Sequence, residues 1–249
     1  MMTSALFATT MTVGLGGEAM AQEVRPADLV ASFESTSVRP LIAQQGAPQA
    51  YGGVALGGIA RLGEGLALPL GGGVGLTDRF ELGVDLGVGI EPFDALERAR
   101  AYGRFGVVPG RVAVQVGSWL PTEPGEHAGM ELMVPVRRVT DRLELYGQTR
   151  GSWTPGADAL VLGAGGTVAV QVGGPVWTGL DLGVAQRWAE GTTVGVVATG
   201  VHTGVLVGEA MLVRARLALP SVTARDETDA WDGLSAKTVE LMVVRRFGG

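Results

Sequence analysis

The feature that most constrains this chain is a strict two-residue alternation of apolar positions with polar or glycine positions. It runs unbroken from Phe80 to Ile90 and recurs over residues 130–137 and 176–184. Because successive side chains of a β-strand point to opposite faces, each segment has one apolar face and one polar or bare face. Strands of about ten residues with this pattern, separated by turn residues, are typical of a transmembrane β-barrel whose apolar face meets lipid.

The composition favours the same class. Only 18% of the 249 residues are charged, against roughly 25% in an average soluble domain. Beyond the N-terminus no stretch of about 18 consecutive apolar residues predicts a membrane helix, although the mean hydropathy is +0.28. A soluble β-sandwich also has alternating strands, but the 41 glycines leave little of the charged outer face that it would need.

Charge and cysteine content exclude other classes. The net charge of −6 argues against nucleic acid as a partner, since a basic surface is the usual footprint of nucleic-acid binding. The absence of cysteine excludes a disulfide scaffold and thiolate chemistry.

The N-terminal part of the chain predicts export. A short apolar segment over residues 5–15 precedes Ala19-Met20-Ala21, which has the small-x-small pattern of a signal-peptidase site. We therefore expect a signal peptide over residues 1–21 and an irregular periplasmic segment over the polar, proline-containing residues 22–50. The transmembrane barrel is then expected to occupy residues 51–249.

Alternation and turn residues predict about twelve strands, with a range of ten to fourteen. The predicted fold is all-β, a single closed antiparallel up-and-down barrel. Five tight connections, at 77–79, 109–110, 139–142, 173–175 and 202–203, alternate with mostly longer ones, as in outer-membrane barrels with short periplasmic turns and longer extracellular loops. The predicted strands cover 52–62, 65–76, 80–91, 98–108, 111–120, 128–138, 143–152, 159–172, 176–188, 192–201, 204–219 and 235–247.

The turn positions also predict strand register. Around Pro109-Gly110, Arg104 faces Gln115 and Val107 faces Val112. Around residues 139–142, Arg137 is expected to face Glu144, and Glu131 to face Arg150. Opposite charges across a ladder are stabilising by roughly 0.2–1 kcal/mol, whereas a charge turned to lipid at mid-membrane costs roughly 2–4 kcal/mol. The charged faces are therefore predicted to point into the lumen.

Two further residue types have positional meaning. Pro69 and Pro135 lie inside predicted strands, where each removes a hydrogen-bond donor, so we expect a bulge or a lost bond at both. Aromatic residues near strand ends are expected to form girdles at the two membrane interfaces. The expected girdle residues are Phe80, Trp177 and Phe247 on the periplasmic side and Trp119, Trp153 and Trp188 on the outer side.

Two segments carry a resemblance to known proteins. The run Gly75-Leu-Thr-Asp-Arg-Phe-Glu-Leu-Gly-Val84 resembles a turn-and-strand phrase of Gram-negative outer-membrane barrels, including channel families grouped with porins. The ending at Phe247, with Val239, Leu241 and Val243 at alternate positions before it, resembles the C-terminal insertion signal of such proteins. The resemblance implies an outer-membrane location, recognition of the last strand by the barrel-assembly machinery, and a barrel that conducts small solutes.

The sequence offers little for catalysis, metals or cofactors. His127 and His202 are the only histidines, and neither belongs to a cluster with metal-ligand spacing or to a Ser–His pair. The clusters at Gly71–Gly73 and Gly163–Gly166 lack the Lys-Ser/Thr that follows a phosphate loop. We therefore expect no enzymatic activity, no metal and no cofactor.

The candidate functional residues are charges whose parity places them on the lumenal face. Two interpretations stay open, because such charges either line an aqueous pore and tune which solutes pass or pair into a plug of salt bridges. Lumenal glycines such as Gly83 and Gly179 are expected to widen the bore, which favours a narrow pore. The candidates are Glu81, Asp85, Arg100, Arg104, Glu131, Arg137, Glu144, Arg150, Asp181, Arg187, Arg214, Arg216 and Glu240.

The function predicted from the sequence is therefore a narrow passive channel for small solutes in the outer membrane of a Gram-negative bacterium, with membrane lipid as its surroundings. The first alternative is a closed barrel with a structural, adhesive or lipid-modifying role, in which His202 would be tested as the active group. The second alternative is a secreted soluble β protein.

Overall fold

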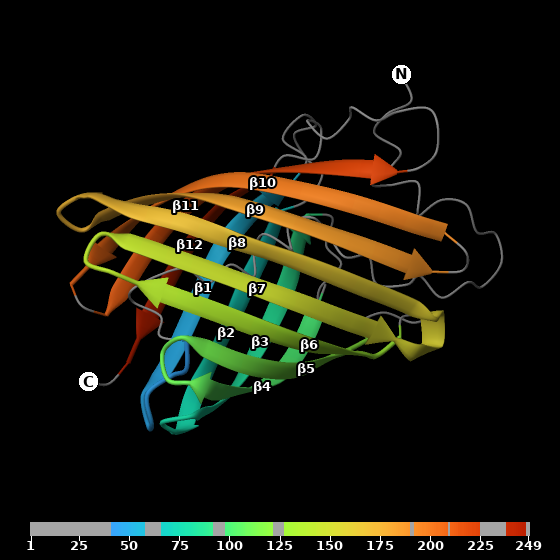
Figure 1. Ribbon diagram of the computed structural model, residues 1–249, viewed down its shortest axis with the longest axis horizontal. Coiled ribbons are helices and arrows are strands. Elements are labelled where there is room, and N and C mark those ends of the chain that lie inside the picture. The colour runs from blue at the N-terminus through green and yellow to red at the C-terminus, as the bar shows by residue number, and fades with distance from the viewer. Residues whose placement is uncertain are drawn as a thin grey trace.

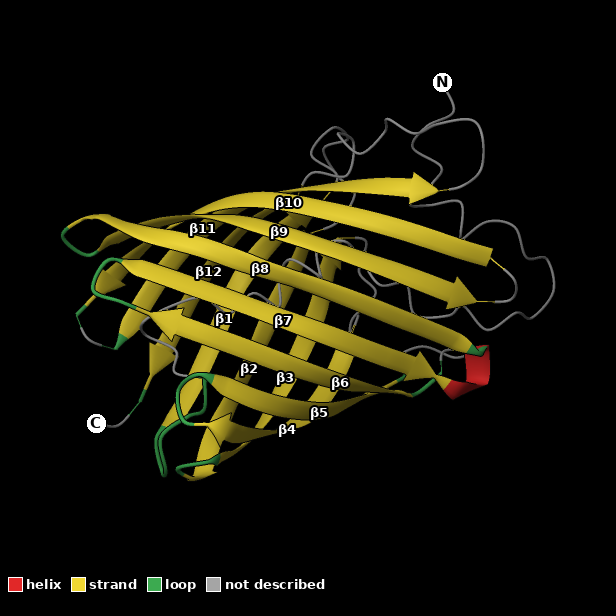
Figure 2. Cartoon of the chain, in the orientation of Figure 1, coloured by secondary structure: helices red, strands yellow, loops and turns green. Residues whose placement is uncertain are grey.

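The structure is a closed barrel of twelve antiparallel strands, as predicted (Figures 1 and 2). The computed structural model describes residues 41–57, 66–91, 98–121, 127–189, 192–208, 210–224 and 238–247. Each strand pairs with its neighbours in sequence, and the first pairs with the last. The strands are β1 (Pro48–Gly57), β2 (Leu66–Thr77), β3 (Phe80–Glu91), β4 (Arg98–Val108), β5 (Val112–Leu120), β6 (Gly129–Val139), β7 (Leu143–Thr154), β8 (Ala159–Gly173), β9 (Val176–Ala189), β10 (Thr192–Val207), β11 (Met211–Ala224) and β12 (Thr238–Arg246).

The two ends of the barrel differ in their connections. At one end, to the left in Figure 1, every connection between strands is at most three residues long. The connections at the other end reach from Ala224 to Thr238 at their longest, and one of them holds a short 3-10 turn, Pro155–Ala157. Pro48 and Arg246 lie at the tight-turn end. The alternation of short and long connections therefore follows the predicted one.

The chain departs from the predicted strands between β10 and β11. A turn was expected at His202-Thr203, but β10 continues to Val207, and the chain reverses at Gly208, whose φ of +64° suits glycine. His202 and Thr203 fit the alternation of β10, since His202 is buried and Thr203 is exposed. The prediction was wrong because two adjacent polar residues resemble a turn when only one of them faces outward.

The beginning of the barrel also differs. The first strand starts at Pro48, and residues 41–47 pack against the barrel interior, whereas the barrel was expected to begin at residue 51. The predicted signal peptide and residues 22–40 lie outside the described residues. Both the signal peptide and the periplasmic location of residues 22–40 stay predictions.

The predicted register holds at one hairpin and shifts at another. Arg104 pairs with Gln115 as expected, but a bulge between Gly106 and Val108 pairs Val108 with Val112, so Val107 does not face Val112. In the β6–β7 hairpin the turn lies one residue further along the chain than expected, closed by the backbone bond from Thr140 N to Leu143 O at 2.8 Å. That displacement shifts the ladder by two residues and preserves the faces of both strands.

As a result, Arg137 lies across from Tyr146 and Glu131 lies across from Ser152. The predicted direct pairings were therefore wrong. The Arg137–Glu144 and Glu131–Arg150 contacts themselves form along diagonals of the ladder, as described below.

The two strand prolines interrupt the ladder on one side only. Next to Pro69, the pairing of β1 with β2 stops at Gly52 and resumes at Ala55. Next to Pro135, the pairing of β5 with β6 stops at Val112 and resumes at Gln115. Both breaks agree with the expected loss of a donor.

The outer surface of the barrel is apolar. Closing the ring satisfies the ladder hydrogen bonds within the sheet, which is the condition for strands to cross a membrane. Among the described residues no helix has the length and apolar character needed to span a membrane. The outward-facing exposed side chains include Leu82, Val84, Leu86, Val116, Leu132, Leu162, Val168, Leu180, Leu182, Val184, Val201 and Leu241.

The expected aromatic girdles are only partly present. Trp153 is 46% exposed and Phe247 is 43% exposed, so both face outward as expected. Trp119 and Trp177 are buried and lie on the inward faces of β5 and β9, so their assignment to the girdles was wrong. The parity of each strand explains this, because Trp119 shares its face with Gln115, and Trp177 shares its face with Asp181.

Candidate functional site: the barrel interior

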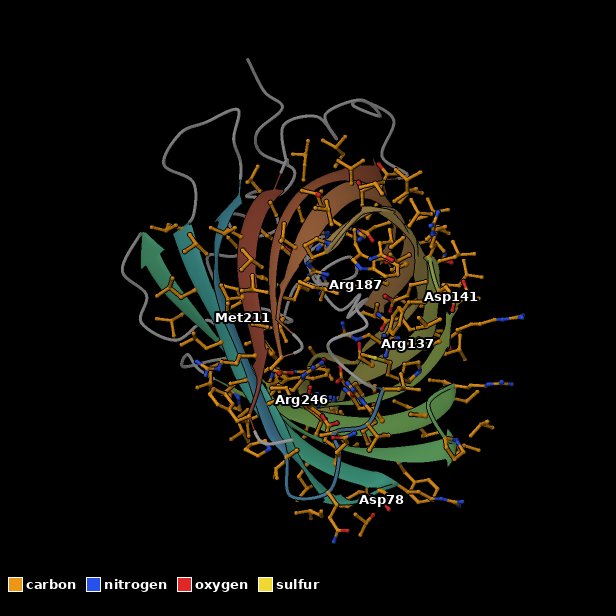
Figure 3. All side chains as sticks on the ribbon, turned by 90° about the vertical axis from the view of Figure 1, so that its left-hand side faces the viewer. Asp78, Arg137, Asp141, Arg187, Met211 and Arg246 are labelled. Carbon is orange, nitrogen blue, oxygen red and sulfur yellow. The ribbon has the colours of Figure 1, made fainter. Side chains whose placement is uncertain are left out.

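All thirteen candidate charges lie on the inward faces of the strands. Seven are arginines and six are carboxylates. Figure 3, which views the barrel from the tight-turn end, shows Arg137 and Arg187 within the ring of strands and Asp78 and Asp141 at its outer edge. Asp85, Arg100, Arg137 and Arg187 are partly buried, and the other nine candidates are buried. Their role in lining a pore stays a prediction.

The first polar network joins β1 and β3–β7 and is centred on Arg100. The Arg100 guanidinium donates from Nε to Asp85 at 2.6 Å and from Nη1 to Glu131 at 2.7 Å. Tyr51 donates to the other oxygen of Asp85. Arg150 of β7 forms an ion pair with Glu131 at 3.1 Å. One cation thus joins two carboxylates, and Glu131 in turn joins two cations.

The same network continues through Gln115. Arg104 donates to Gln115 Oε1 from Nε at 2.8 Å and from Nη2 at 2.6 Å, and Gln115 Nε2 donates to Glu131 at 3.3 Å. Tyr102 lies below both guanidinium groups, with its ring centroid 5.5 Å from Arg100 Cζ and 5.3 Å from Arg104 Cζ. Cations over an aromatic face are stabilised by its quadrupole. These contacts hold the long arginine side chains in defined positions along the wall.

A second network covers the opposite part of the ring, from β8 to β12. Asp181 accepts a hydrogen bond from Thr167 Oγ1 at 2.6 Å and from Arg216 Nε at 3.1 Å, and its Oδ2 lies 3.2 Å from His202 Nδ1. Arg216 also donates from Nη1 to Glu240 at 3.0 Å. Each of these five strands contributes one side chain to the network.

The remaining candidates flank the two networks. Arg137 Nε donates to Glu144 at 2.8 Å. Arg214 Nη2 lies 3.5 Å from the sulfur of Met242. Arg187, near the long-loop end of β9, has a buried Nε without a hydrogen-bond partner among the described residues. Within the described residues, Arg187 is therefore the candidate arginine with the fewest polar contacts to neighbouring side chains.

The inward glycines do not simply widen the bore. Four rings each lie directly across the ladder from a glycine, and a Cβ on that glycine would collide with the ring. Such packing covers bare strand backbone with an aromatic face. The expectation that Gly83 and Gly179 enlarge the lumen was therefore wrong, because their space is occupied. The pairs are Tyr51 with Gly71, Tyr102 with Gly83, Trp119 with Gly129 and His202 with Gly179.

A short stretch of chain before β1 also lies inside the barrel. Leu41 and Ala43 are 4% and 2% exposed. Arg104 Nη1 donates to the carbonyl oxygen of Leu41 at 3.1 Å, and the Ala43 N–H donates to Glu81 at 2.7 Å. Sequence reasoning missed this stretch, because three apolar residues in a polar segment carry no periodic signal.

The interior shows no metal-binding arrangement among the described residues, where no group of three or more potential ligands comes together. His202, proposed as an active group for a lipid-modifying role, is buried in mid-strand with its ring against Gly179. What the arrangement offers chemically is a wall of paired, fixed charges with aromatic rings between them. Tyr102 could have been found from the sequence, since it shares the parity of Arg100 and Arg104.

Comparison with known proteins finds similarity in structure only. No protein-family model matches the sequence, and the search of curated proteins found no match. The barrel is similar to an outer membrane channel from Pseudomonas putida F1, with 11% identity, a TM-score of 0.56, and coverage of 86% of this chain and 99% of that chain. It is also similar to the KdgM porin, with 11% identity, a TM-score of 0.54 and coverage of 80% and 99%. The NanC porin gives 10% identity, a TM-score of 0.52 and coverage of 80% and 98%.

Proposed function

We propose that this protein is an outer-membrane channel that passes small solutes through a narrow, charge-lined lumen. The observation that carries the proposal is the closed ring of twelve strands with an apolar exterior and an interior of paired charges. The solved structures that share this fold carry the names of channels and porins. About eight strands fill with side chains and about sixteen leave an open channel, so twelve strands fit a restricted path.

The fold also supports the direction of insertion. The tight turns, the start of β1 and the end of β12 lie at the same end of the barrel, which in outer-membrane barrels is the periplasmic end. Phe247 directly follows the last strand, and its N–H donates to the carbonyl of Pro48 at 2.8 Å, at the seam between β12 and β1. We propose that the barrel-assembly machinery recognises this strand, with Phe247 facing outward as its terminal apolar residue.

Planar lipid bilayers test the channel. Purified protein added to one side should produce discrete current steps, small in comparison with those of a sixteen-stranded porin. The absence of steps at every applied voltage, from protein shown to be a folded barrel by its gel mobility before heating, would contradict the channel.

A closed barrel with a structural or adhesive role is the second candidate. The observation that favours it is the occupied interior, where Leu41 and the two networks fill space that a pore would need. This role predicts that folded protein stays silent in the bilayer even after the interior contacts are removed.

A further inference from the structure

The chain reverses into its own lumen just before the first strand. Gly46, with a φ of +70°, allows a tight turn in which the Ala47 N–H donates to the Gln44 carbonyl at 3.0 Å. The Gly46 N–H donates to the Gly75 carbonyl at 2.9 Å, next to the bridge between Gln45 and Gly75. Residues 45 and 46 are thereby attached to the backbone of β2 at Gly75.

Two buried ionic side chains then hold the backbone of this segment. Glu81 accepts from the Ala43 N–H, and Arg104 donates to the Leu41 carbonyl. Both side chains are at most 2% exposed. A hydrogen bond that involves an ionised group is roughly twice as strong as one between neutral groups. Glu81 and Arg104 therefore form a seat that holds one amide N–H and one carbonyl of a peptide backbone.

The wall is shaped to fit the segment. A Cβ on Gly106 would lie 3.2 Å from Ile42 Cγ1, and a Cβ on Gly75 would lie 2.7 Å from the Gln44 carbonyl carbon. The glycines thus leave room on β2 and β4 that side chains would fill.

The segment also contributes to a plug across the bore. Leu41 belongs to one packed apolar cluster with Ala113 of β5, Tyr146 of β7, Ala198 of β10 and Ala218 of β11. Strands β5 and β11 are half a ring apart in the strand order, so they face each other across the lumen. A continuous cluster that includes both walls narrows the bore at that level.

We infer that residues 41–47 are a tethered occupant of a peptide-binding seat in the lumen, and that the channel conducts more freely when the segment leaves the seat. The ligand class that this seat takes is a short peptide, held by its backbone, with the chain's own segment as its resident. The conductance part of this inference rests on the proposed channel function, whereas the seating of the segment does not.

A disulfide tests the seating alone. The chain has no native cysteine, so Ile42→Cys with Gly106→Cys introduces one pair, at a spacing that a disulfide can bridge. Mild oxidation of the folded barrel should crosslink the pair nearly completely and change its gel mobility. Ile42→Cys with Val168→Cys, which is on the outer surface, is the matched control and should not crosslink. Failure of the first pair to crosslink in folded protein would overturn the inference, whatever the conductance.

A backbone variant tests the consequence. Ala43→Pro removes the N–H that Glu81 accepts and leaves the barrel wall unchanged, whereas Arg138→Met alters only an exposed side chain outside the segment. In bilayers, Ala43→Pro should raise the conductance severalfold, Arg138→Met should leave it as in the unmodified chain, and the oxidised Ile42→Cys/Gly106→Cys pair should lower it until reduction.

A synthetic peptide tests the ligand class. A capped peptide with the sequence of residues 41–47 should block the Ala43→Pro channel in a dose-dependent manner, and a peptide of the same composition in scrambled order that lacks the Gly46 turn should block less. Equal conductance of all variants in a conducting barrel would overturn the inference. Silence of every variant, together with efficient crosslinking, would instead contradict the channel and leave the seat established.

Discussion

Tyr102 of β4 lies directly across the ladder from Gly83 of β3, and its ring covers the bare backbone of that glycine while its hydroxyl donates to Glu81 at 3.0 Å. The pair shows how part of the wall is built, because the ring of an inward side chain lies against a glycine of the neighbouring strand. The same arrangement recurs at Tyr51, Trp119 and His202.

Gly83→Ala should destabilise the barrel, because its Cβ would collide with the Tyr102 ring. Overpacking of this kind costs about 1–3 kcal/mol. The midpoint of thermal unfolding in detergent, followed by circular dichroism, measures the effect. Gly103→Ala is the matched control, since its Cβ would meet Phe80 at an ordinary 3.5 Å. Equal midpoints for the two variants would show that the ring does not occupy the glycine's space.

Arg216→Met should be among the most damaging single changes, because it leaves Asp181 and Glu240 buried without their shared cation. Removing one partner of a buried ion pair costs about 3–5 kcal/mol. Adding Asp181→Asn and Glu240→Gln should recover much of the loss in denaturant unfolding. Arg138→Met, at an exposed position, should leave the unfolding curve unchanged, and a triple variant no better than Arg216→Met would argue against the pairing.

Ion selectivity should follow the charge of the first network. Arg100→Gln removes the cation between Asp85 and Glu131, so the lumen gains net negative charge and the reversal potential in a salt gradient should shift toward cation selectivity. Asp85→Asn should shift it the opposite way. Arg79→Gln, in an exposed turn, serves as the control. Shifts of the same sign for the two lumenal variants would contradict a path beside Arg100.

The proposed orientation can be tested by labelling cysteines on intact cells. Pro155→Cys, at the long-loop end, should react with a membrane-impermeant maleimide, whereas Asp141→Cys, in a tight turn, should react only after the cells are broken. Both positions are exposed, and the chain has no other cysteine. The reverse pattern would place the tight turns outside the cell.

Much of this barrel follows from local alternation. The bounds of β3 and β4 were predicted to the residue, because Phe80–Ile90 and Arg98–Val108 alternate cleanly between turn residues. The inward parity of the charged residues follows from the same pattern, since a one-residue slip would turn all of them toward lipid.

The remaining features depend on distant parts of the chain. The β6–β7 register is set by where Thr140 closes the turn, which alternation does not specify within two residues. The covering of Gly83 by Tyr102 depends on which residues pair across the strands. The sequence alone therefore does not show that the space beside this glycine is occupied. The seating of Leu41 depends on Arg104, 63 residues away, and no local pattern encodes such a contact.

The pairing of β1 with β12 has a consequence for how this barrel forms. The first strand pairs with a strand that ends at Arg246, almost two hundred residues later, so closing the ring joins distant parts of the chain and is expected to be slow. Until then both terminal strands present unpaired backbone edges, which are templates for aggregation. A nascent chain of this design therefore benefits from a chaperone in the aqueous compartment, and a chain without its last strand would keep two open sheet edges.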